Sequence, residues 1–487
     1  MQILTKSGDE IYLVYHPDEK IEVGETLEII DTKEDRGLIV QVIELNLVDL
    51  PGILEDVVRQ EAVSKNFRVL EVASSDLKKL MIDLKNMKIA KTKIRHEIKR
   101  GKIVPWSGWT PSRSSEIKSI KIRELVKSLD IEGKRNIVAG SNVFDGSDFI
   151  VNAYDLQGIN VIVGKKGTGK SHLAKTLLLG LIDHGARVLV FDINDEYSNL
   201  RYKVDGSKSE YYEKIITLEP DPSKDSEYTP LKFTLPYIGL EVFYSVMVDV
   251  LKLPEASAAT LREIWNRLEE SGSLRLSKLF HEIENESSRV REAIYRRLKA
   301  LEETRIVTED EEKETRIEEY LKNLESGGAL IVNLKAKSRI AQSIVVQTIV
   351  SKLRQILESK DSKPLFLFAE EAHLYLERTM WLDLVTRMRH LGAYQFYMTN
   401  TPTSIDDLII RQTDNIFIFN LTNRKDLDHI MPATKIDEET IKSIVPALPP
   451  RTYLAIGLTT KEYPFIAYTR ELEYQTAGKT RLLWKER

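Results

Sequence analysis

The sequence predicts an α/β fold in which a parallel β-sheet core is interrupted by a helical bundle and preceded by a small β-barrel. Beyond about residue 135, several short runs are almost continuously apolar, which is typical of strands in a parallel sheet covered on both faces. Helical patterns separate these runs, as crossover connections between parallel strands require. The runs span residues 159–163, 186–193, 329–334, 365–369, 394–398 and 415–421, with two further strands expected at 452–458 and 463–468.

Residues 1 to about 48 are rich in β-forming side chains. Runs at 11–15, 26–30 and 37–43 are separated by turns that contain Gly, Asp and Lys, which is the pattern of a small barrel. Residues 52–66 then carry apolar side chains at helical spacing, so a helix is expected there.

Residues 88–123 return to an extended pattern that is strongly basic. Basic side chains interleaved with aromatic rings could face a nucleic-acid backbone. Charge runs are more often the solvated edges of a domain, and this second interpretation is favoured. The stretch contains Lys91, Lys93, Arg95, Lys99, Arg100, Lys102 and Arg113 around Trp106 and Trp109.

The second and third predicted strands of the core are too far apart in the sequence for a single crossover. Residues 238–325 between them are helical in pattern, with heptad-like stretches at 259–268 and 289–298. We therefore expect a helical bundle inserted into the core. The predicted domains are a barrel at 1–130, a core at 131–237 and 326–470, the insertion at 238–325 and a tail at 471–487.

Composition limits the possible classes of function. The chain has 487 residues, enough for several domains, and its formal net charge of −4 offers no overall attraction to nucleic acid. It contains no cysteine, which excludes disulfides and thiolate metal sites. No long apolar run or signal-peptide pattern is present, so we expect a cytoplasmic protein that does not interact with membranes.

A glycine-rich turn follows the first predicted strand of the core. Gly164 and Gly169-Lys170-Ser171 match the P-loop pattern, and an amphipathic helix follows them. Glycines let successive backbone N–H groups converge on phosphate oxygens, the lysine reaches the β- and γ-phosphates, and the serine hydroxyl ligates Mg²⁺. The sequence therefore predicts a binding site for ATP and Mg²⁺. Its expected members are Gly164, Lys165, Lys166, Gly167, Thr168, Gly169, Lys170, Ser171 and His172.

Paired carboxylates end the strand predicted at 365–369. We expect this strand to lie beside the P-loop strand, where Glu370 would hold a water on Mg²⁺ and Glu371 would polarise the attacking water. Glutamate is also common at helix N-termini, and without a P-loop that interpretation would be preferred.

Two further residues are candidates for catalysis. Asp192 ends the second core strand and could lie beside the γ-phosphate, although a turn-forming Asp there is equally expected. Arg389 lies just before a strand, from which it could reach the nucleotide of a neighbouring subunit. A surface arginine at a helix end is more often only solvated.

Taken together, these motifs resemble those of the HerA family, the archaeal hexameric DNA translocases of the FtsK–HerA branch of P-loop ATPases. The resemblance covers nearly the whole chain and implies a RecA-like P-loop NTPase core. It is carried by Gly-Thr-Gly-Lys-Ser at 167–171, Phe-Asp-Ile-Asn-Asp-Glu-Tyr at 191–197, Glu-Glu-Ala-His at 370–373, Arg-His-Leu-Gly at 389–392 and Met-Thr-Asn-Thr-Pro at 398–402.

The resemblance implies roles for individual residues. Lys170 and Ser171 would bind phosphate and Mg²⁺, and Asp192 and Glu371 would serve catalysis. Arg389 would be an arginine finger acting across a subunit interface. Three positions depart from the family pattern. Asn400 stands where the family usually has a longer Gln as a polar sensor, Thr401 stands where Arg is common, and Gly158 stands where the family tends to have a basic residue near the nucleotide.

The resemblance also implies a function, namely a hexameric ring that moves double-stranded DNA with ATP and acts with a NurA-type nuclease in DNA end resection. Two other functions stay open at this point. One is an ATPase that moves or remodels protein or single-stranded nucleic acid. The other is a regulatory or defence scaffold whose ring matters more than its slow turnover.

Overall fold

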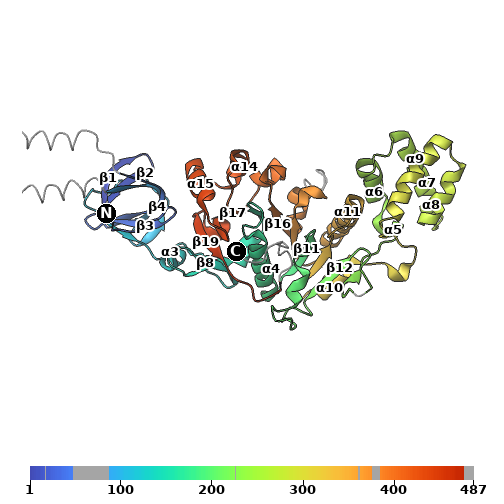
Figure 1. The fold of residues 1–487 in the computed structure, drawn as a ribbon, viewed down its shortest axis with the longest axis horizontal. Helices are drawn as coiled ribbons and strands as arrows, with labels where there is room; N and C mark the ends of the chain where they lie inside the picture. Colours follow the sequence, from blue (N-terminus) through green and yellow to red (C-terminus); the bar gives the residue numbers. More distant parts are fainter. Residues whose placement is uncertain (17, 48–86, 225, 360–361, 376–383, 476–487) are drawn as a thin grey trace, which may run out of the picture.

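The computed structural model describes residues 1–16, 18–47, 87–224, 226–359, 362–375 and 384–475. The molecule is elongated, with an antiparallel sheet at one end, a large mixed sheet in the middle and a helical bundle at the other end (Figure 1). The helix expected at 52–66 lies outside the described residues.

The N-terminal sheet is an antiparallel half-barrel of seven strands in the order β1-β2-β5-β4-β3-β7, with β6 paired to β5. Side chains alternate between its core and its outer face, as the pleat of a strand dictates. Leu13, Ile29 and Val40 are fully buried in this core. The strands are β1 (Gln2–Ser7), β2 (Glu10–Tyr15), β3 (Thr26–Asp31), β4 (Arg36–Leu47), β5 (Lys88–Lys99), β6 (Lys102–Val104) and β7 (Glu116–Ser119).

Several basic residues of the 88–123 stretch attach the half-barrel to the middle of the molecule. Lys91 Nζ lies 2.5 Å from Glu439 Oε1, and Arg95 Nη1 lies 3.0 Å from Asp437 Oδ2. Both acidic partners lie at the start of α15 (Glu438–Ile444), far away in the sequence. The side chains of Lys91 and Arg95 are largely buried, so for these two residues the favoured interpretation as a solvated edge is wrong.

The central sheet has twelve strands in the order β13-β12-β14-β11-β15-β16-β10-β17-β18-β19-β8-β9. Neighbours from β13 to β17 are parallel, and those from β17 to β9 are antiparallel. The predicted parallel core is therefore confirmed, while β8, β9, β12 and β13 were not predicted. The strands are β8 (Asn136–Asn142), β9 (Asp148–Asn152), β10 (Ile159–Val163), β11 (Arg187–Asp192), β12 (Ile215–Glu219), β13 (Thr229–Pro230), β14 (Gly328–Asn333), β15 (Leu365–Glu370), β16 (Ala393–Thr399), β17 (Asn415–Phe419), β18 (Thr452–Gly457) and β19 (Phe465–Thr469).

Helices cover the two faces of this sheet. Successive side chains of a strand point to opposite faces, so Val161 of β10 packs in one hydrophobic cluster and Ile162 in another. The cluster around Val161 includes the buried face of α11 (Arg339–Leu357), whereas the cluster around Ile162 includes α4 (Lys170–Asp183). Burial on both faces explains why the central strands are apolar throughout.

The helical insertion extends from the face of the sheet covered by α11 (Figure 1). Its core, centred on the fully buried Trp265, belongs to the same hydrophobic cluster as Val161 and α11. The helices of the insertion are α5 (Leu235–Ile238), α6 (Leu240–Ser245), the π-helix η3 (Val246–Val250), α7 (Glu255–Glu270), α8 (Leu276–Glu282), α9 (Ser288–Glu302) and α10 (Ile317–Asn323).

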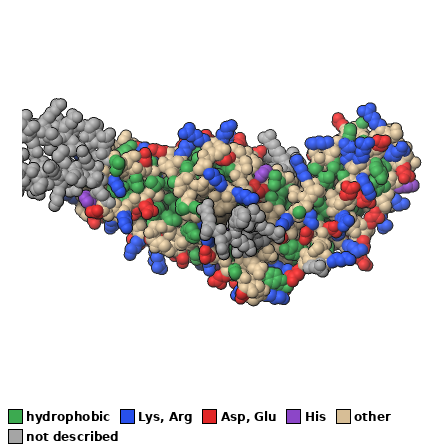
Figure 2. Space-filling view, viewed as in Figure 1, with side chains coloured by type: hydrophobic (Ala, Val, Ile, Leu, Met, Phe, Trp, Pro, Cys, Tyr) green, Lys and Arg blue, Asp and Glu red, His purple; other side chains and the backbone are tan. Residues whose placement is uncertain are grey.

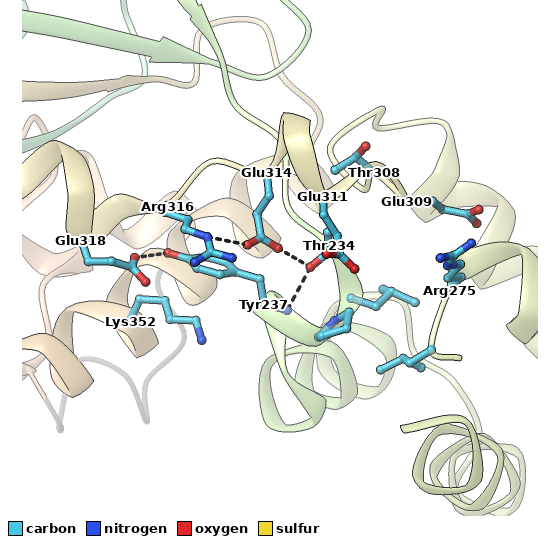
Figure 3. Close-up of a pocket in the computed structure, with 13 residues that line it drawn as sticks. Thr234, Tyr237, Arg275, Thr308, Glu309, Glu311, Glu314, Arg316, Glu318 and Lys352 are labelled. Carbon is cyan, nitrogen blue, oxygen red and sulfur yellow. Dashed lines mark hydrogen bonds and ion pairs between the residues drawn. The ribbon is translucent and has the colours of Figure 1, made fainter. Parts of the chain in front are cut away.

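A polar cavity of about 370 Å³ lies where the insertion meets α11 (Figure 3). Tyr237 Oη donates to Glu318 Oε2 at 2.7 Å, and Lys352 Nζ of α11 lies 4.5 Å from the centre of the Tyr237 ring. Glu314 accepts from both Arg316 and Thr234. These contacts join the insertion to the core at a place that contains no residue of the glycine-rich turn. Across the part of the chain described here, no helix has the length and apolar character needed to span a membrane.

Candidate nucleotide-binding site

The P-loop connects β10 to α4 and contains glycines at positions where other residues would not fit. Gly164 has φ 153°, and a Cβ there would lie 2.4 Å from Cβ of Phe419 on the neighbouring strand β17. Gly169 has φ 115° and forms the N-cap of α4. The loop is closed by Thr168 Oγ1, which donates to the Lys165 carbonyl at 2.7 Å. The turn thus leads directly into the N-terminus of α4, which is the arrangement that favours binding of an anion.

Lys170 is the best-anchored residue of this loop. Its Nζ donates to the carbonyls of Gly164 and Lys165 at 2.8 and 2.9 Å and to Asn400 Oδ1 at 2.5 Å. Burial lowers the pKa of Lys170 to about 8, and the nearby charges of Glu371, Glu370 and Glu196 oppose this shift. The ammonium group thus lies among three carboxylates.

Glu371 is fixed by its backbone and by its carboxylate. Its φ of 45° is left-handed, which costs a non-glycine residue about 1–2 kcal/mol. The carboxylate accepts from Thr399 Oγ1 at 2.7 Å and from the backbone and side-chain nitrogens of Asn400 at 2.9 and 2.5 Å. These three donors hold the carboxylate in one orientation beside Lys170.

The expectation that the Glu370–Glu371 strand lies beside the P-loop strand is wrong. Strand β16 lies between β15 and β10 and pairs with both in parallel. Asn400 directly follows β16, so its amide lies between the two groups that the sequence predicted to meet. Its oxygen accepts from Lys170 and its nitrogen donates to Glu371. The structure thus joins these three predicted residues in one hydrogen-bonded chain.

Glu370 and Asp192 are buried deeper, at the ends of adjacent strands β15 and β11. Burial raises the pKa of Glu370 well above its ordinary value, with the charge of Asp192 adding to the effect. Burial also raises the pKa of Asp192, to about 6. Asp192 accepts from the backbone nitrogens of Asn194 and Tyr197, and Asn194 Nδ2 donates to Glu370 at 3.1 Å. In this conformation Asp192 faces its own loop, and β15 and β16 separate its strand from β10.

Two residues near Lys170 had no predicted role. Lys175 on α4 is almost fully buried, and its Nζ lies 3.0 Å from Glu196 Oε2 in the loop after β11. This ion pair ties the P-loop helix to the loop that carries Asn194. The only available indication was the position of Glu196 within the Phe-Asp-Ile-Asn-Asp-Glu-Tyr motif.

The remaining predicted members of the loop differ in exposure. Lys165, Lys166 and Gly167 are exposed, whereas Ser171 and His172 are half-buried in the first turn of α4. Burial lowers the pKa of His172. No cluster of three or more His, Asp or Glu side chains suited to a metal occurs among the described residues. Mg²⁺ commonly needs only one or two protein ligands besides substrate phosphates and water, so a site made by Ser171 and Glu370 fits its chemistry.

Arg389 lies at the opposite edge of the sheet from the P-loop. It precedes β16, whereas the P-loop follows β10, and these two strands are parallel. The five residues of β10 at about 3.3 Å each separate the two edges by about 16 Å. Arg389 Nη2 lies 2.9 Å from Asp414 Oδ2. The structure therefore does not bring Arg389 to the P-loop of its own chain.

The lowered pKa of Lys170 predicts that ATP affinity depends on pH. Above pH 8 the free protein loses the Lys170 proton, whereas bound phosphate would retain it, so binding requires proton uptake. The dissociation constant of ATP, measured by calorimetry, should be about tenfold higher at pH 9 than at pH 7. Lys170→Met should bind weakly with no such dependence, and a flat profile in the unmodified protein would contradict the assignment.

Residues 158–353 match the family model described as the central domain of the helicase HerA. No curated protein matches the chain in sequence.

The fold is similar to that of TrwB, a bacterial conjugative coupling protein. TrwB in complex with a non-hydrolysable ATP analogue gives a TM-score of 0.52 at 15% identity, over 74% of this chain and 94% of that chain. TrwB with ADP and Mg²⁺ gives 0.51 at the same identity and coverage. The predicted cofactors, ATP and Mg²⁺, agree with these bound ligands. Residues 158–353, which include the P-loop, Lys170 and Asp192, are therefore similar to the central domain of the helicase HerA, and the fold of the chain is similar to that of TrwB.

Proposed function

We propose that the protein is a ring-forming ATPase that uses hydrolysis to move double-stranded DNA. The match of residues 158–353 to the HerA central domain supports this proposal. TrwB, a plasmid coupling protein by description, has the same kind of core. Duplex DNA would pass through a central pore and be held by its phosphates without sequence readout.

The observation that carries the ring is the placement of Arg389. Arg389 lies at the sheet edge opposite to its own P-loop. As an arginine finger it can therefore complete only the nucleotide site of another subunit. An interface that brings one edge of a subunit to the other edge of its neighbour is heterologous, and such interfaces form rings when the rotation closes. A hexamer is the ring we propose, in line with the HerA resemblance.

Within each subunit we assign the steps to named side chains. Lys170 binds the β- and γ-phosphates, Ser171 and Glu370 hold Mg²⁺, and Glu371 accepts a proton from the attacking water. Bound Mg²⁺ supplies positive charge against the phosphate oxygens. To hold Mg²⁺, the buried Glu370 would have to be ionised, as metal ligands must be. Asp192 shapes the loop that presents Asn194 to Glu370.

Asn400 is proposed as the sensor of the triphosphate. To reach phosphate, Lys170 must leave the carbonyls of Gly164 and Lys165 and the side-chain oxygen of Asn400. The Asn400 side chain, which also donates to Glu371, then loses one of its two hydrogen-bond partners. The orientation of Glu371 thereby responds to whether phosphate is bound. A shorter amide than the usual Gln suffices for this contact, because Asn400 already bridges both partners.

The resemblance to HerA further supports a partnership with a NurA-type nuclease in DNA end resection. Basic and acidic side chains are interspersed over the face shown in Figure 2, in keeping with the net charge of −4. DNA binding would therefore use a local surface inside the ring, and its strength would fall steeply with salt.

The proposal is tested by the ATPase rate of the size-characterised oligomer with linear duplex DNA, single-stranded DNA and no DNA. We expect several-fold stimulation by duplex DNA that disappears as salt is raised. Stimulation by single strands alone would favour a motor on another polymer. Slow turnover that ignores DNA, together with a stable complex with another protein, would favour a scaffold.

A further inference from the structure

We infer that Asp414 is a positioning residue that holds the guanidinium of Arg389 in the orientation needed to reach a neighbouring nucleotide. The inference rests on the proposed function, in which Arg389 acts across a subunit interface. Arg389 Nη2 donates to Asp414 Oδ1 at 3.0 Å and lies 2.9 Å from Oδ2. Asp414 lies just before β17, at the same sheet edge as Arg389.

The Asp414 carboxylate is itself fixed to the first residue of the P-loop strand. Its Oδ2 accepts from the Ile159 backbone nitrogen at 2.8 Å, and its own backbone nitrogen donates to the Ile159 carbonyl at 2.8 Å. Its carbonyl accepts from the Leu458 nitrogen at 3.1 Å. Because Asp414 is held at both its backbone and its side chain, it sets the position of the arginine and does not follow it.

Gly158 makes room for this arrangement. A Cβ at Gly158 would lie 2.2 Å from Asp414 Oδ2 and 2.8 Å from its Cγ, well inside contact distance. Any larger residue would push the carboxylate away from Ile159 and Arg389. The position of the carboxylate is therefore specified at two places in the sequence, 158 and 414.

The geometry of the pair leaves part of the guanidinium available. A guanidinium carries five N–H donors in one plane. Asp414 engages only Nη2, so the donors on Nε and Nη1 remain for an acceptor on a neighbouring subunit. The Arg389 side chain is 31% exposed, which allows such an approach. A side chain already held in one rotamer loses less freedom when it meets phosphate.

The test compares Asp414→Asn with unmodified protein in steady-state ATPase assays. Asparagine keeps an oxygen for the Ile159 amide but removes the charge that binds Arg389. We expect kcat to fall about tenfold with KM for ATP unchanged, because the variant does not alter its own P-loop. Asp155→Asn is the matched control: Asp155 lies at the same edge, where its carbonyl accepts from Asn415, but its carboxylate pairs with Lys461 and not with Arg389.

Mixed rings separate positioning from a structural effect on the P-loop strand. Lys170→Ala subunits cannot bind phosphate but still carry an intact Asp414–Arg389 pair, so they should restore turnover to Asp414→Asn neighbours. If Asp414→Asn damaged its own P-loop through Ile159, no mixing ratio would rescue it and KM would rise. Either of those results would overturn the inference.

A second variant, and a control that each variant is folded, make the result interpretable. Gly158→Ala, whose methyl group would displace the carboxylate, should reproduce the loss of kcat, and ring size and thermal unfolding would show whether each variant is folded. Unchanged kcat in both folded variants would also overturn the inference. Full activity of Arg389→Ala would instead refute the proposed finger itself, so the two failures are distinguishable.

Discussion

Replacing Glu371 with Gln is expected to leave ATP bound and to slow its hydrolysis by about a thousandfold. Glutamine has the same shape and can still accept from the Asn400 backbone, but it cannot take a proton from water. The hydrogen bonds from Thr399 and Asn400 orient the carboxylate and do not replace its basicity. The measurements are single-turnover hydrolysis and equilibrium binding of a fluorescent ATP analogue.

The control for this variant is Glu358→Gln, which changes an exposed carboxylate at the end of α11. It should hydrolyse ATP at the normal rate. Normal turnover in Glu371→Gln would remove Glu371 from the mechanism. Loss of ATP binding would instead mean that its contact with Asn400 mainly supports the fold of the site.

Replacing Arg389 with Ala is expected to suppress hydrolysis by about a thousandfold or more while ATP still binds. The reason is that Arg389 lies across the sheet from its own P-loop, so its removal leaves that loop intact and deprives the neighbouring site of positive charge. Rings mixed from Arg389→Ala and Lys170→Ala subunits should recover part of the activity, because each subunit supplies what the other lacks.

Arg411→Ala provides the matched control for the finger. Arg411 is exposed at the end of α13 (Asp407–Arg411), a few residues before Asp414 and at the same edge of the sheet. Its loss should leave turnover unchanged. Absence of rescue in mixed rings at every ratio would contradict action across the interface.

Much of the fold could be predicted because the central strands are buried on both faces and so are apolar along their whole length. Strand β12 was missed because only part of it is fully buried, and β8 because polar residues such as Asn136 and Ser141 lie near its ends and leave only a short apolar run. The order of strands could not be predicted from the residues, since it depends on packing between distant segments. That is why the position of β16 between β15 and β10 was not foreseen.

The candidate site could be predicted where its residues form a short sequence motif, as Gly164 and Lys170 do. Its supporting contacts were not predictable, because they join distant segments of the chain. Asp414 and Arg389 are 25 residues apart, and Lys175 and Glu196 are 21 apart. Neither of these two contacts can be recognised from the spacing of its residues. Only the folded chain shows that Asn400 bridges a lysine 230 positions away.

The insertion shares one hydrophobic cluster with the sheet, from Val161 through α11 to Trp265. Such close-packed interiors resist deformation, so the bundle turns with the sheet as a single body. Any rotation of the core would therefore carry the outer end of the bundle through a longer arc than the sheet edge where nucleotide would sit.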